Sequence, residues 1–381
     1  MKAVDRRLKV MTVVGTRPEI IRLAATIRRL DKYTDHVLVH TGQNYDYELN
    51  EVFFEDLRLR KPDYFLAADT SSLGVVLGSI LAKTEEVLLR EKPDAMIVLG
   101  DTNSCISALI ARRMKVPVYH MEAGNRCFDE NVPEETNRRL VDHVADYNLV
   151  YTEHARRNLL AEGLHPSRIL LTGSPMKEVL DANAAEIAAS TVLERQELTA
   201  GEYFMVSVHR EENVDNLERL SEILAALQTI ARTYDVPVLI STHPRTRKRL
   251  EDQPEELKRD LRFHPPFGFN DYVKLQREAK LVLSDSGTIS EESSLLGFPA
   301  VTLRDAIERP ESLDTGAIIT TGVSADAIVD CIEIVLRQFA EDGRPTIPED
   351  YQIADTSRRT VDFIRSTAHT HHKRAGIYVA S

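Results

Sequence analysis

The sequence predicts an α/β protein built from two doubly wound, parallel-sheet domains with a cleft between them. The chain of 381 residues is too long for one comfortable hydrophobic core, which favours two domains. Short apolar runs alternate with longer amphipathic stretches, a pattern typical of parallel strands joined by helices. The runs fall into two series, and residues 181–202 between them carry no strand signal. We expect the domain boundary in this stretch.

Twelve short apolar runs predict buried parallel strands. The first series comprises residues 8–14, 36–40, 95–99, 117–121, 147–151 and 168–172. The second comprises residues 203–208, 237–241, 261–264, 280–284, 299–303 and 317–320. Helical patterns lie between the runs. One of them is the i, i+3, i+4 stripe of Leu73, Val76, Leu77, Ile80, Leu81, Val87 and Leu88.

Composition limits the partners and the compartment. A net charge of −12 argues against nucleic acid and anionic membranes as partners. No apolar run approaches the ~20 residues that span a bilayer, and the N-terminal residues contain no signal-peptide pattern. Three widely spaced cysteines, Cys105, Cys127 and Cys331, are typical of a reducing compartment, so we expect a cytoplasmic protein. No metal-ligand spacing is evident, and we interpret His369, His371 and His372 as a solvated tail.

Ligands of doubly wound sheets bind at the carboxyl ends of the strands, so the residues that follow each strand are the candidates. After the first strand, Gly15 permits a tight turn and Pro18 suits a first helical turn, where Arg17 could face an anion. A plain strand–helix turn explains these residues equally well. Asp101 follows the third strand, either as a site residue or as the cap of the next helix.

Carboxylates crowd the segment that follows the fourth strand. Glu122 stands at the strand end, where a carboxylate is costly unless it is paired, and Arg126 or Arg138 could be the partner. Glu134 and Glu135 lie in a first helical turn, where the helix dipole favours acids. Their position therefore has a structural explanation, whereas that of Glu122 requires a partner or a function.

The strand ends of the second domain carry histidines, arginines and a turn of small residues. His209 follows its first strand, and His243 follows the second. The turn of residues 285–288 offers N–H groups suited to an anion, and Glu292 lies about one helical turn further on. Together with the acids of the first domain, these residues predict a nucleotide-sugar site. No G-x-G-x-x-G, P-loop or G-x-S-x-G motif suggests another reaction.

Nine blocks occur in order along essentially the whole chain. They are GTRPEIIRL, TGQNYDYELN, GDTNS, HMEAGNR, PEETNRR, TGSP, HREEN, DSGTISEE and LRDAIERPE. In these blocks the chain resembles the non-hydrolysing UDP-N-acetylglucosamine 2-epimerase family. The resemblance implies two Rossmann-like domains of the glycosyltransferase-B-like kind. Residues 1–178 and 355–381, including a returning C-terminal helix, would form the acid–base domain, and residues 179–354 the UDP-binding domain.

Within the family, the chain is most similar to the UDP-N-acetyl-L-fucosamine synthase branch. The similarity lies in HTGQNYDYELNEVFFEDL, GDTNSC, MEAGNRCFDENVPEETNR and TGSPM. That branch epimerises UDP-2-acetamido-2,6-dideoxy-L-talose at C2 for capsule or O-antigen sugars. Enzymes that act on UDP-N-acetylglucosamine more often carry GLRTGD, with a lysine at the position of Arg22 and a glycine at that of Thr288. Interconversion of UDP-N-acetylglucosamine and UDP-N-acetylmannosamine is the alternative activity.

The family resemblance also implies a mechanism and a set of residues. A base removes the C2 proton while UDP leaves, and UDP re-adds to the glycal after protonation of the opposite face. The implied catalytic residues are Asp101, Glu122, Glu134 and His209. The implied UDP and substrate-binding residues are Arg17, Arg22, Arg138, His243, Ser286, Gly287, Glu292 and Arg309. The resemblance implies a homodimer, without a metal or other cofactor.

Three other functions remain open from the sequence. A glycosyltransferase of the same fold would keep the UDP site but does not need three acids at the strand ends of the first domain. A UDP-sugar-binding module could lose those acids altogether. A hydrolysing epimerase would release free UDP and sugar. The presence of Asp101, Glu122 and Glu134 favours an enzyme over a binding module.

Overall fold

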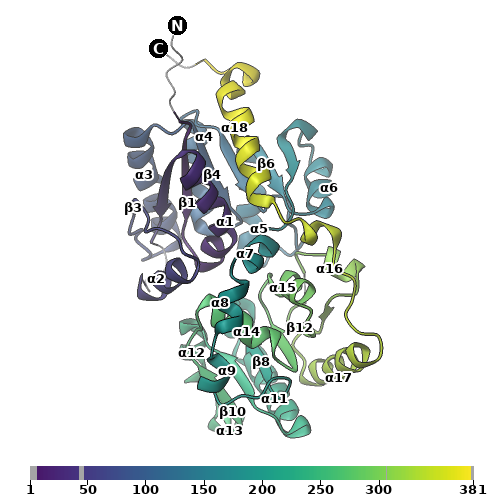
Figure 1. Cartoon of the computed structure of the whole chain (residues 1–381). Coiled ribbons are helices and arrows are strands. Elements are labelled where there is room, and N and C mark those ends of the chain that lie inside the picture. Colours follow the sequence, from purple (N-terminus) through teal and green to yellow (C-terminus); the bar gives the residue numbers. More distant parts are fainter. Residues whose placement is uncertain (1–6, 43–46, 306, 379–381) are drawn as a thin grey trace. The chain divides into compact units, whose positions relative to one another are not determined.

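The computed structural model describes residues 7–42, 47–305 and 307–378 (Figure 1). The chain forms two compact units: Met1–Asp181 with Asp350–Ser381, here called the first unit, and Ala182–Glu349, here called the second unit. Each contains one parallel sheet with helices as the connections. Part of the block TGQNYDYELN and one residue of LRDAIERPE lie outside the described residues.

The sheet of the first unit has seven parallel strands in the order β3-β2-β1-β4-β5-β6-β7. They are β1 Lys9–Val14, β2 Asp35–His40, β3 Tyr64–Phe65, β4 Ala95–Leu99, β5 Val118–Met121, β6 Tyr147–Val150 and β7 Ile169–Leu171. All six strands predicted here are confirmed, and β3 is an additional one. The strand order reverses between β1 and β4, which is the place where doubly wound sheets bind ligands.

The helices of the first unit follow the predicted alternation. They are α1 Arg17–Tyr33, α2 Tyr47–Asp56, α3 Leu73–Glu91, η1 Asn103–Ile106, α4 Ser107–Arg113, α5 Pro133–Val144, α6 Glu153–Ala161, η2 Pro166–Arg168, α7 Met176–Ala182, η3 Glu349–Gln352 and α18 Thr356–Ala375. In α3, Ser72 accepts a hydrogen bond from Val75 N and caps the helix. The predicted stripe of α3 is buried at Val76, Ile80, Val87 and Leu88, but Leu73 is exposed.

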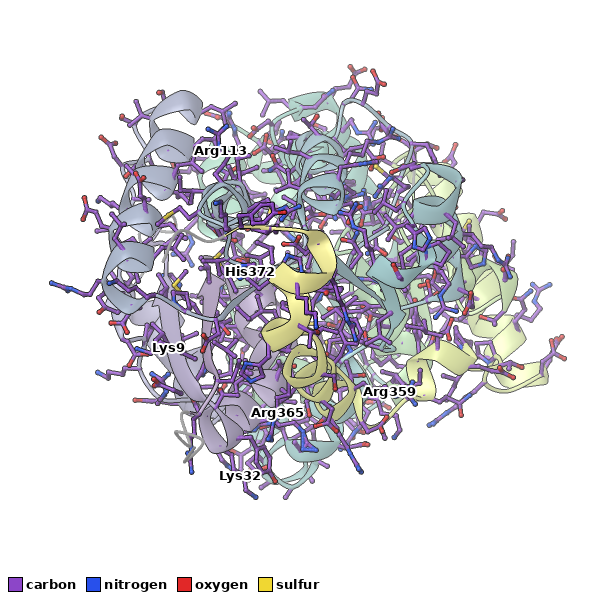
Figure 2. All side chains as sticks on the ribbon, turned by 90° about the horizontal axis from the view of Figure 1, so that it is seen from above. Lys9, Lys32, Arg113, Arg359, Arg365 and His372 are labelled. Atoms are coloured by element: carbon purple, nitrogen blue, oxygen red, sulfur yellow. The ribbon has the colours of Figure 1, made fainter. Side chains whose placement is uncertain are left out.

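Helix α18 closes the first unit by packing on α1 (Figure 1). Its Phe363 meets the rings of Tyr119 and Tyr147 edge-on, and the hydroxyls of Tyr119 and Thr367 are 2.7 Å apart. Seen from above, Arg359 and Arg365 point outward from the helix (Figure 2). The interpretation of the histidine cluster as a solvated tail is wrong for His371, which is buried with its Nε2 3.2 Å from Asp146.

The sheet of the second unit has six parallel strands in the order β10-β9-β8-β11-β12-β13. They are β8 Phe204–Ser207, β9 Val238–Ser241, β10 Leu261–His264, β11 Leu281–Ser284, β12 Ala300–Thr302 and β13 Ile319–Thr320, and all six were predicted. The helices are α8 Ala184–Ala189, α9 Val192–Arg195, α10 Glu211–Val214, α11 Leu217–Tyr234, α12 Pro244–Leu250, α13 Glu255–Lys258, α14 Phe269–Arg277, α15 Ile289–Leu296, α16 Glu311–Asp314 and α17 Ala325–Glu341. Here the order reverses between β8 and β11.

Buried apolar side chains cover both faces of each sheet. In the second unit, Val206 and Leu283 face a core with α11 and α17, whereas Met205 and Val282 face another with α14 and α15. This two-sided burial explains why the strands appear as nearly continuous apolar runs. Within the described part of the chain, no helix combines the length and apolar character that a membrane crossing requires.

Candidate active site

The first group of candidate residues lies at the carboxyl ends of β1, β4 and β5. Gly100 N donates to Met121 O at 3.0 Å, so Asp101 and Glu122 follow two strands that are hydrogen-bonded to each other. A Cβ atom at Gly100 would lie 3.6 Å from Glu122 Oε2. The structure therefore brings the two predicted acids to the same edge of the sheet, beside the reversal of strand order.

Glu122 is a buried carboxylate with a backbone in the left-handed region, at φ = 63°. Its carboxylate pairs with the guanidinium of Arg22 from α1, and it accepts a hydrogen bond from Asn125 Nδ2 at 3.3 Å. Of the two partners that the sequence offered for Glu122, Arg126 is wrong. That guanidinium forms ion pairs with Asp142 and Glu162 instead.

Asp101 is held by Arg138, a residue of α5. The Nε and Nη2 of Arg138 donate to Asp101 Oδ2 at 3.1 and 2.5 Å, and Nη1 donates to Glu135 Oε2 at 2.9 Å. Asn137 Nδ2 also donates to the Asp101 carbonyl oxygen at 2.9 Å. Two successive residues of α5 thus fix both the side chain and the backbone of Asp101. Asp101 itself remains one-quarter exposed, with access to solvent.

Glu135 fastens the loop between β5 and α5. Burial raises the pKa of its carboxyl, but the hydrogen bond from Cys127 N and the charge of Arg138 outweigh burial and hold that pKa below its usual value.

Glu134, its neighbour in the first turn of α5, is partly exposed. Arg17 begins α1 with its guanidinium carbon 5.7 Å from the ring centre of Phe53.

Glu19 is a buried acid of this region that sequence reasoning did not select. It accepts hydrogen bonds from Gly15 N at 2.9 Å, from Thr16 Oγ1 at 2.8 Å and from Ser104 Oγ. Burial raises the pKa of the Glu19 carboxyl to about 7, although these hydrogen bonds favour the ionised form. Glu19 joins the loop after β1 to the loop that carries Asp101.

The second group of candidates surrounds Asp285, at the end of β11. Asp285 is fully buried and accepts from His209 N at 3.0 Å, from Arg210 N at 2.9 Å and from Asn213 Nδ2 at 3.1 Å. The Nδ1 of His209 lies 3.2 Å from Asp285 Oδ1. One carboxylate thus fixes the backbone and the imidazole of His209, whose ring is otherwise exposed. Sequence reasoning included Asp285 only as part of a turn.

The turn after β11 is packed against charged side chains. A Cβ atom at Gly287 would lie 2.8 Å from Glu308 Oε2, so glycine allows the close approach. Arg309 Nε donates to the Gly287 carbonyl oxygen at 2.9 Å, and its Nη2 lies 3.1 Å from the buried carboxylate of Glu291. The hydroxyls of Ser286 and Thr288 are 2.9 Å apart in the same turn.

Two further predicted residues lie in the second unit. His243 follows β9, and its ring centre is 6.4 Å from that of His209. Glu292, in the first turn of α15, accepts from Gln276 Nε2 at 2.6 Å. Among the described residues, no group of three or more His, Cys, Asp or Glu side chains could hold a metal ion.

The fold and these two groups define a class of protein. Two Rossmann-like units, one with acids at its strand ends and the other with cations beside a glycine-containing turn, indicate an enzyme of the glycosyltransferase-B-like kind. The family model described as UDP-N-acetylglucosamine 2-epimerase matches residues 28–365, and the chain belongs to this family. It is therefore an isomerase, a non-hydrolysing UDP-sugar 2-epimerase.

Three relatives illustrate the similarity. The UDP-N-acetylglucosamine 2-epimerase of Methanocaldococcus jannaschii is 38% identical over 343 residues, which cover 87% of this chain and 93% of the relative. The UDP-2,3-diacetamido-2,3-dideoxy-D-glucuronate 2-epimerase of Pseudomonas aeruginosa is 34% identical over 340 residues, 88% of this chain and 94% of the relative. The solved UDP-N-acetylglucosamine 2-epimerase of Rickettsia bellii is 45% identical with a TM-score of 0.89, covering 97% of this chain and 99% of that chain.

Proposed function

We propose that the chain converts UDP-2-acetamido-2,6-dideoxy-L-talose into UDP-N-acetyl-L-fucosamine by epimerisation at C2. The contact between Arg22 and Glu122 carries this proposal. Arg22 stands where the resemblance places a lysine in enzymes that act on UDP-N-acetylglucosamine. A guanidinium is a planar fork rather than a point charge, so it shapes the space beside Glu122 differently. Thr288, the second departure, adds a hydroxyl to the turn after β11.

The proposed reaction is elimination of UDP followed by its re-addition. The C2 proton is not adjacent to a carbonyl, so a free carboxylate is too weak a base to remove it unaided. Positioned acid–base catalysis contributes about 10²- to 10⁴-fold, and preorganised donors to the departing diphosphate supply much of the remainder. We assign the first contribution to the first unit and the second contribution to the second unit.

The proposed roles follow from this division. Asp101 and Glu122 exchange protons with the two faces of C2, with Glu134 as a further acid near the start of α5. His209, held by Asp285, acts beside the diphosphate. The remaining proposed ligands of UDP and its sugar are Arg17, Arg22, Arg138, His243, Ser286, Gly287, Arg309 and, at the ribose hydroxyls, Glu292.

Epimerisation of UDP-N-acetylglucosamine is the second candidate. The 45% identity to the Rickettsia bellii protein of that name favours it. The Pseudomonas aeruginosa relative carries a name with a different sugar, so the family name alone does not define the substrate. We further propose that the enzyme acts as a homodimer, in the cytoplasm, within polysaccharide biosynthesis. Its three cysteines are free, in keeping with a reducing compartment.

Proton NMR in deuterium oxide tests the substrate. The purified protein is incubated separately with UDP-N-acetylglucosamine and with the 6-deoxy-L-talo sugar nucleotide. We expect deuterium at C2 with an intact UDP linkage in the L-talo sample alone. Exchange in the UDP-N-acetylglucosamine sample alone would transfer the assignment to the second candidate. An Arg22→Lys variant is expected to lose exchange with the L-talo compound.

A further inference from the structure

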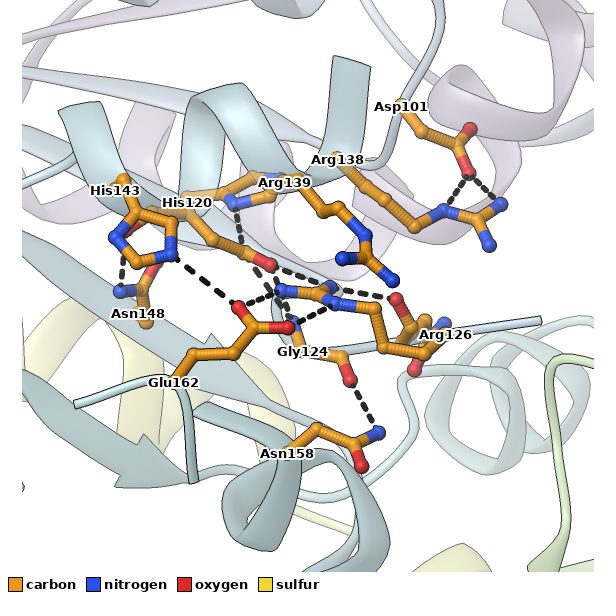
Figure 3. Close-up of polar contacts among 12 residues, drawn as sticks. Asp101, His120, Gly124, Arg126, Arg138, Arg139, His143, Asn148, Asn158 and Glu162 are labelled. Carbon is orange, nitrogen blue, oxygen red and sulfur yellow. Dashed lines mark hydrogen bonds and ion pairs between the residues drawn. The ribbon is translucent and has the colours of Figure 1, made fainter. Parts of the chain in front are cut away.

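A chain of buried charges lies behind the two acids of the first unit. It comprises His120, Asp142, Arg126 and Glu162. Figure 3 labels His120, Arg126 and Glu162 of this set. The side chains of His120, Asp142 and Arg126 are completely buried. Glu162, at the end of this series of charges, is partly exposed to solvent. Two cations and two anions alternate along it when the histidine is protonated. Such balance is what makes buried charge tolerable.

The hydrogen-bond geometry defines the protons on His120. Its Nε2 lies 2.8 Å from the carbonyl oxygen of Gly100, which can only accept, so Nε2 carries a proton. Its Nδ1 lies 2.9 Å from Asp142 Oδ1. Both Asp142 oxygens already serve as acceptors, because Arg126 donates to Oδ2 at 2.7 Å and Gly124 N approaches both oxygens at 3.2 Å. Nδ1 must then be a donor as well.

The two partners of the His120 ring belong to different loops of the site. Gly100 directly precedes Asp101 at the end of β4. Asp142, on α5, binds Gly124 N, two residues after Glu122, and the guanidinium of Arg126. The His120 ring therefore connects the loop that carries Asp101 to the loop that follows Glu122. The Glu122 and Asp101 side chains need a defined separation to serve two faces of one carbon.

We propose that His120 is a positioning residue whose two ring N–H groups fix the Asp101 loop relative to the Glu122 loop. It does not touch the substrate and transfers no proton. A neutral ring could satisfy only one of its two acceptors. The loss of either bond is expected to loosen one acid relative to the other and to reduce turnover without weakening UDP binding.

Long-range proton–nitrogen NMR of protein labelled in its histidines tests the charge. At about pH 8 an ordinary imidazole is neutral. We expect both nitrogens of His120 to remain protonated there, with the signals assigned by their loss in His120→Gln. An unprotonated, pyridine-type nitrogen at His120 would overturn the proposal. This arm needs no substrate, so its outcome is independent of which UDP-sugar the enzyme uses.

Two isosteric variants test the positioning role. The amide of His120→Gln can still donate to Gly100 O, and that of His120→Asn can still donate to Asp142. We expect kcat to fall roughly 10- to 100-fold in each, with KM nearly unchanged. The amide signals of Asp101 and Glu122 are also expected to move. His165→Gln, an exposed histidine of the same unit, serves as the control. Wild-type kcat in a folded His120→Gln protein would refute the positioning role.

Discussion

Glu122 combines burial, an arginine partner and a left-handed backbone in one residue. A non-glycine residue at φ = 63° stores local strain on the order of 1–3 kcal/mol, which persists only where the surroundings hold it. Here the hydrogen-bonded ends of β4 and β5 and the Arg22 guanidinium supply that support. Backbone strain of this size at a strand end is expected of a functional residue rather than of a residue that only packs in the core.

Glu122→Gln is expected to abolish most of the C2 exchange while the protein stays folded. The amide keeps the size of the side chain but cannot take up a proton, so exchange should fall about 10²- to 10⁴-fold. The measurement is the rate of deuterium incorporation at C2. Glu130→Gln, an exposed acid on the same loop, is the control and should retain the wild-type rate. A rate within a few-fold of wild type for Glu122→Gln would exclude the proposed role.

Glu19 predicts a pH dependence of stability. Its folded pKa of about 7 exceeds the ordinary value of 4.5, so the folded protein binds this proton more readily than the unfolded chain does. The resulting stabilisation is complete below the ordinary value and is lost as the pH rises through about 7. Glu19→Gln should therefore gain about 3 kcal/mol in free energy of unfolding, relative to wild type, across that window.

Urea titrations followed by circular dichroism at several pH values check this expectation. Glu130→Gln, whose carboxylate is exposed, should show the wild-type pH dependence. Parallel curves for Glu19→Gln and wild type would mean that the Glu19 carboxyl titrates as it does in the unfolded chain.

At the scale of the elements, apolar runs predicted the strands that are buried on both faces. Strand β3 was missed because its two residues, one half-buried and one exposed, give no such run. The sequence also indicated the strand ends as the candidate site, which the proposed function retains. It could not identify the partners, since Arg22 is one hundred residues from Glu122 along the chain. Arg126 is much closer in sequence but is held by Asp142, a contact that only the fold creates.

Gly124 shows how the Glu122 loop depends on α6. Its φ is 81°, and a Cβ atom there would lie 2.4 Å from the Ala155 carbonyl oxygen. Gly163 has a similar φ of 87° but open space around it. We expect Gly163→Ala to cost about 1 kcal/mol of stability, from backbone strain alone. Gly124→Ala should cost several times more and also lower kcat, because the clash must displace the loop.

Thermal unfolding and initial rates of the two alanine variants distinguish strain from displacement. Equal destabilisation of the two variants, with kcat unchanged in both, would show that the loop tolerates a side chain at position 124.

At the scale of the whole molecule, each unit presents its candidate residues where its strand order reverses. This pattern was predictable, because doubly wound sheets bind ligands at that place. The proposed division of labour leads to a test by ligand binding. Asp285→Asn should weaken UDP binding by about tenfold or more. The NH₂ of the amide would face the backbone N–H groups of His209 and Arg210, which now donate to the carboxylate.

Isothermal titration with UDP measures this effect. Asp305→Asn, an exposed aspartate that pairs with Arg219, is the matched control and should bind UDP like wild type. The Glu122→Gln protein should also bind UDP normally, because Glu122 is proposed to exchange a proton at C2 of the sugar rather than to hold the diphosphate. Undiminished UDP affinity in Asp285→Asn would show that the hydrogen bonds around Asp285 do not contribute to UDP binding.

The placement of α18 in the first unit has a consequence for synthesis on the ribosome. Residues 182–349 form an uninterrupted stretch, so the second unit can fold as soon as it has emerged. The first unit lacks Phe363 against Tyr119 and Tyr147 until residues 356–375 have been translated. A nonsense mutation between residues 350 and 355 would consequently yield a finished second unit joined to an open first one. The exposed aromatic surface of such a fragment is what chaperones and proteases recognise, so truncated copies should be cleared rather than accumulate.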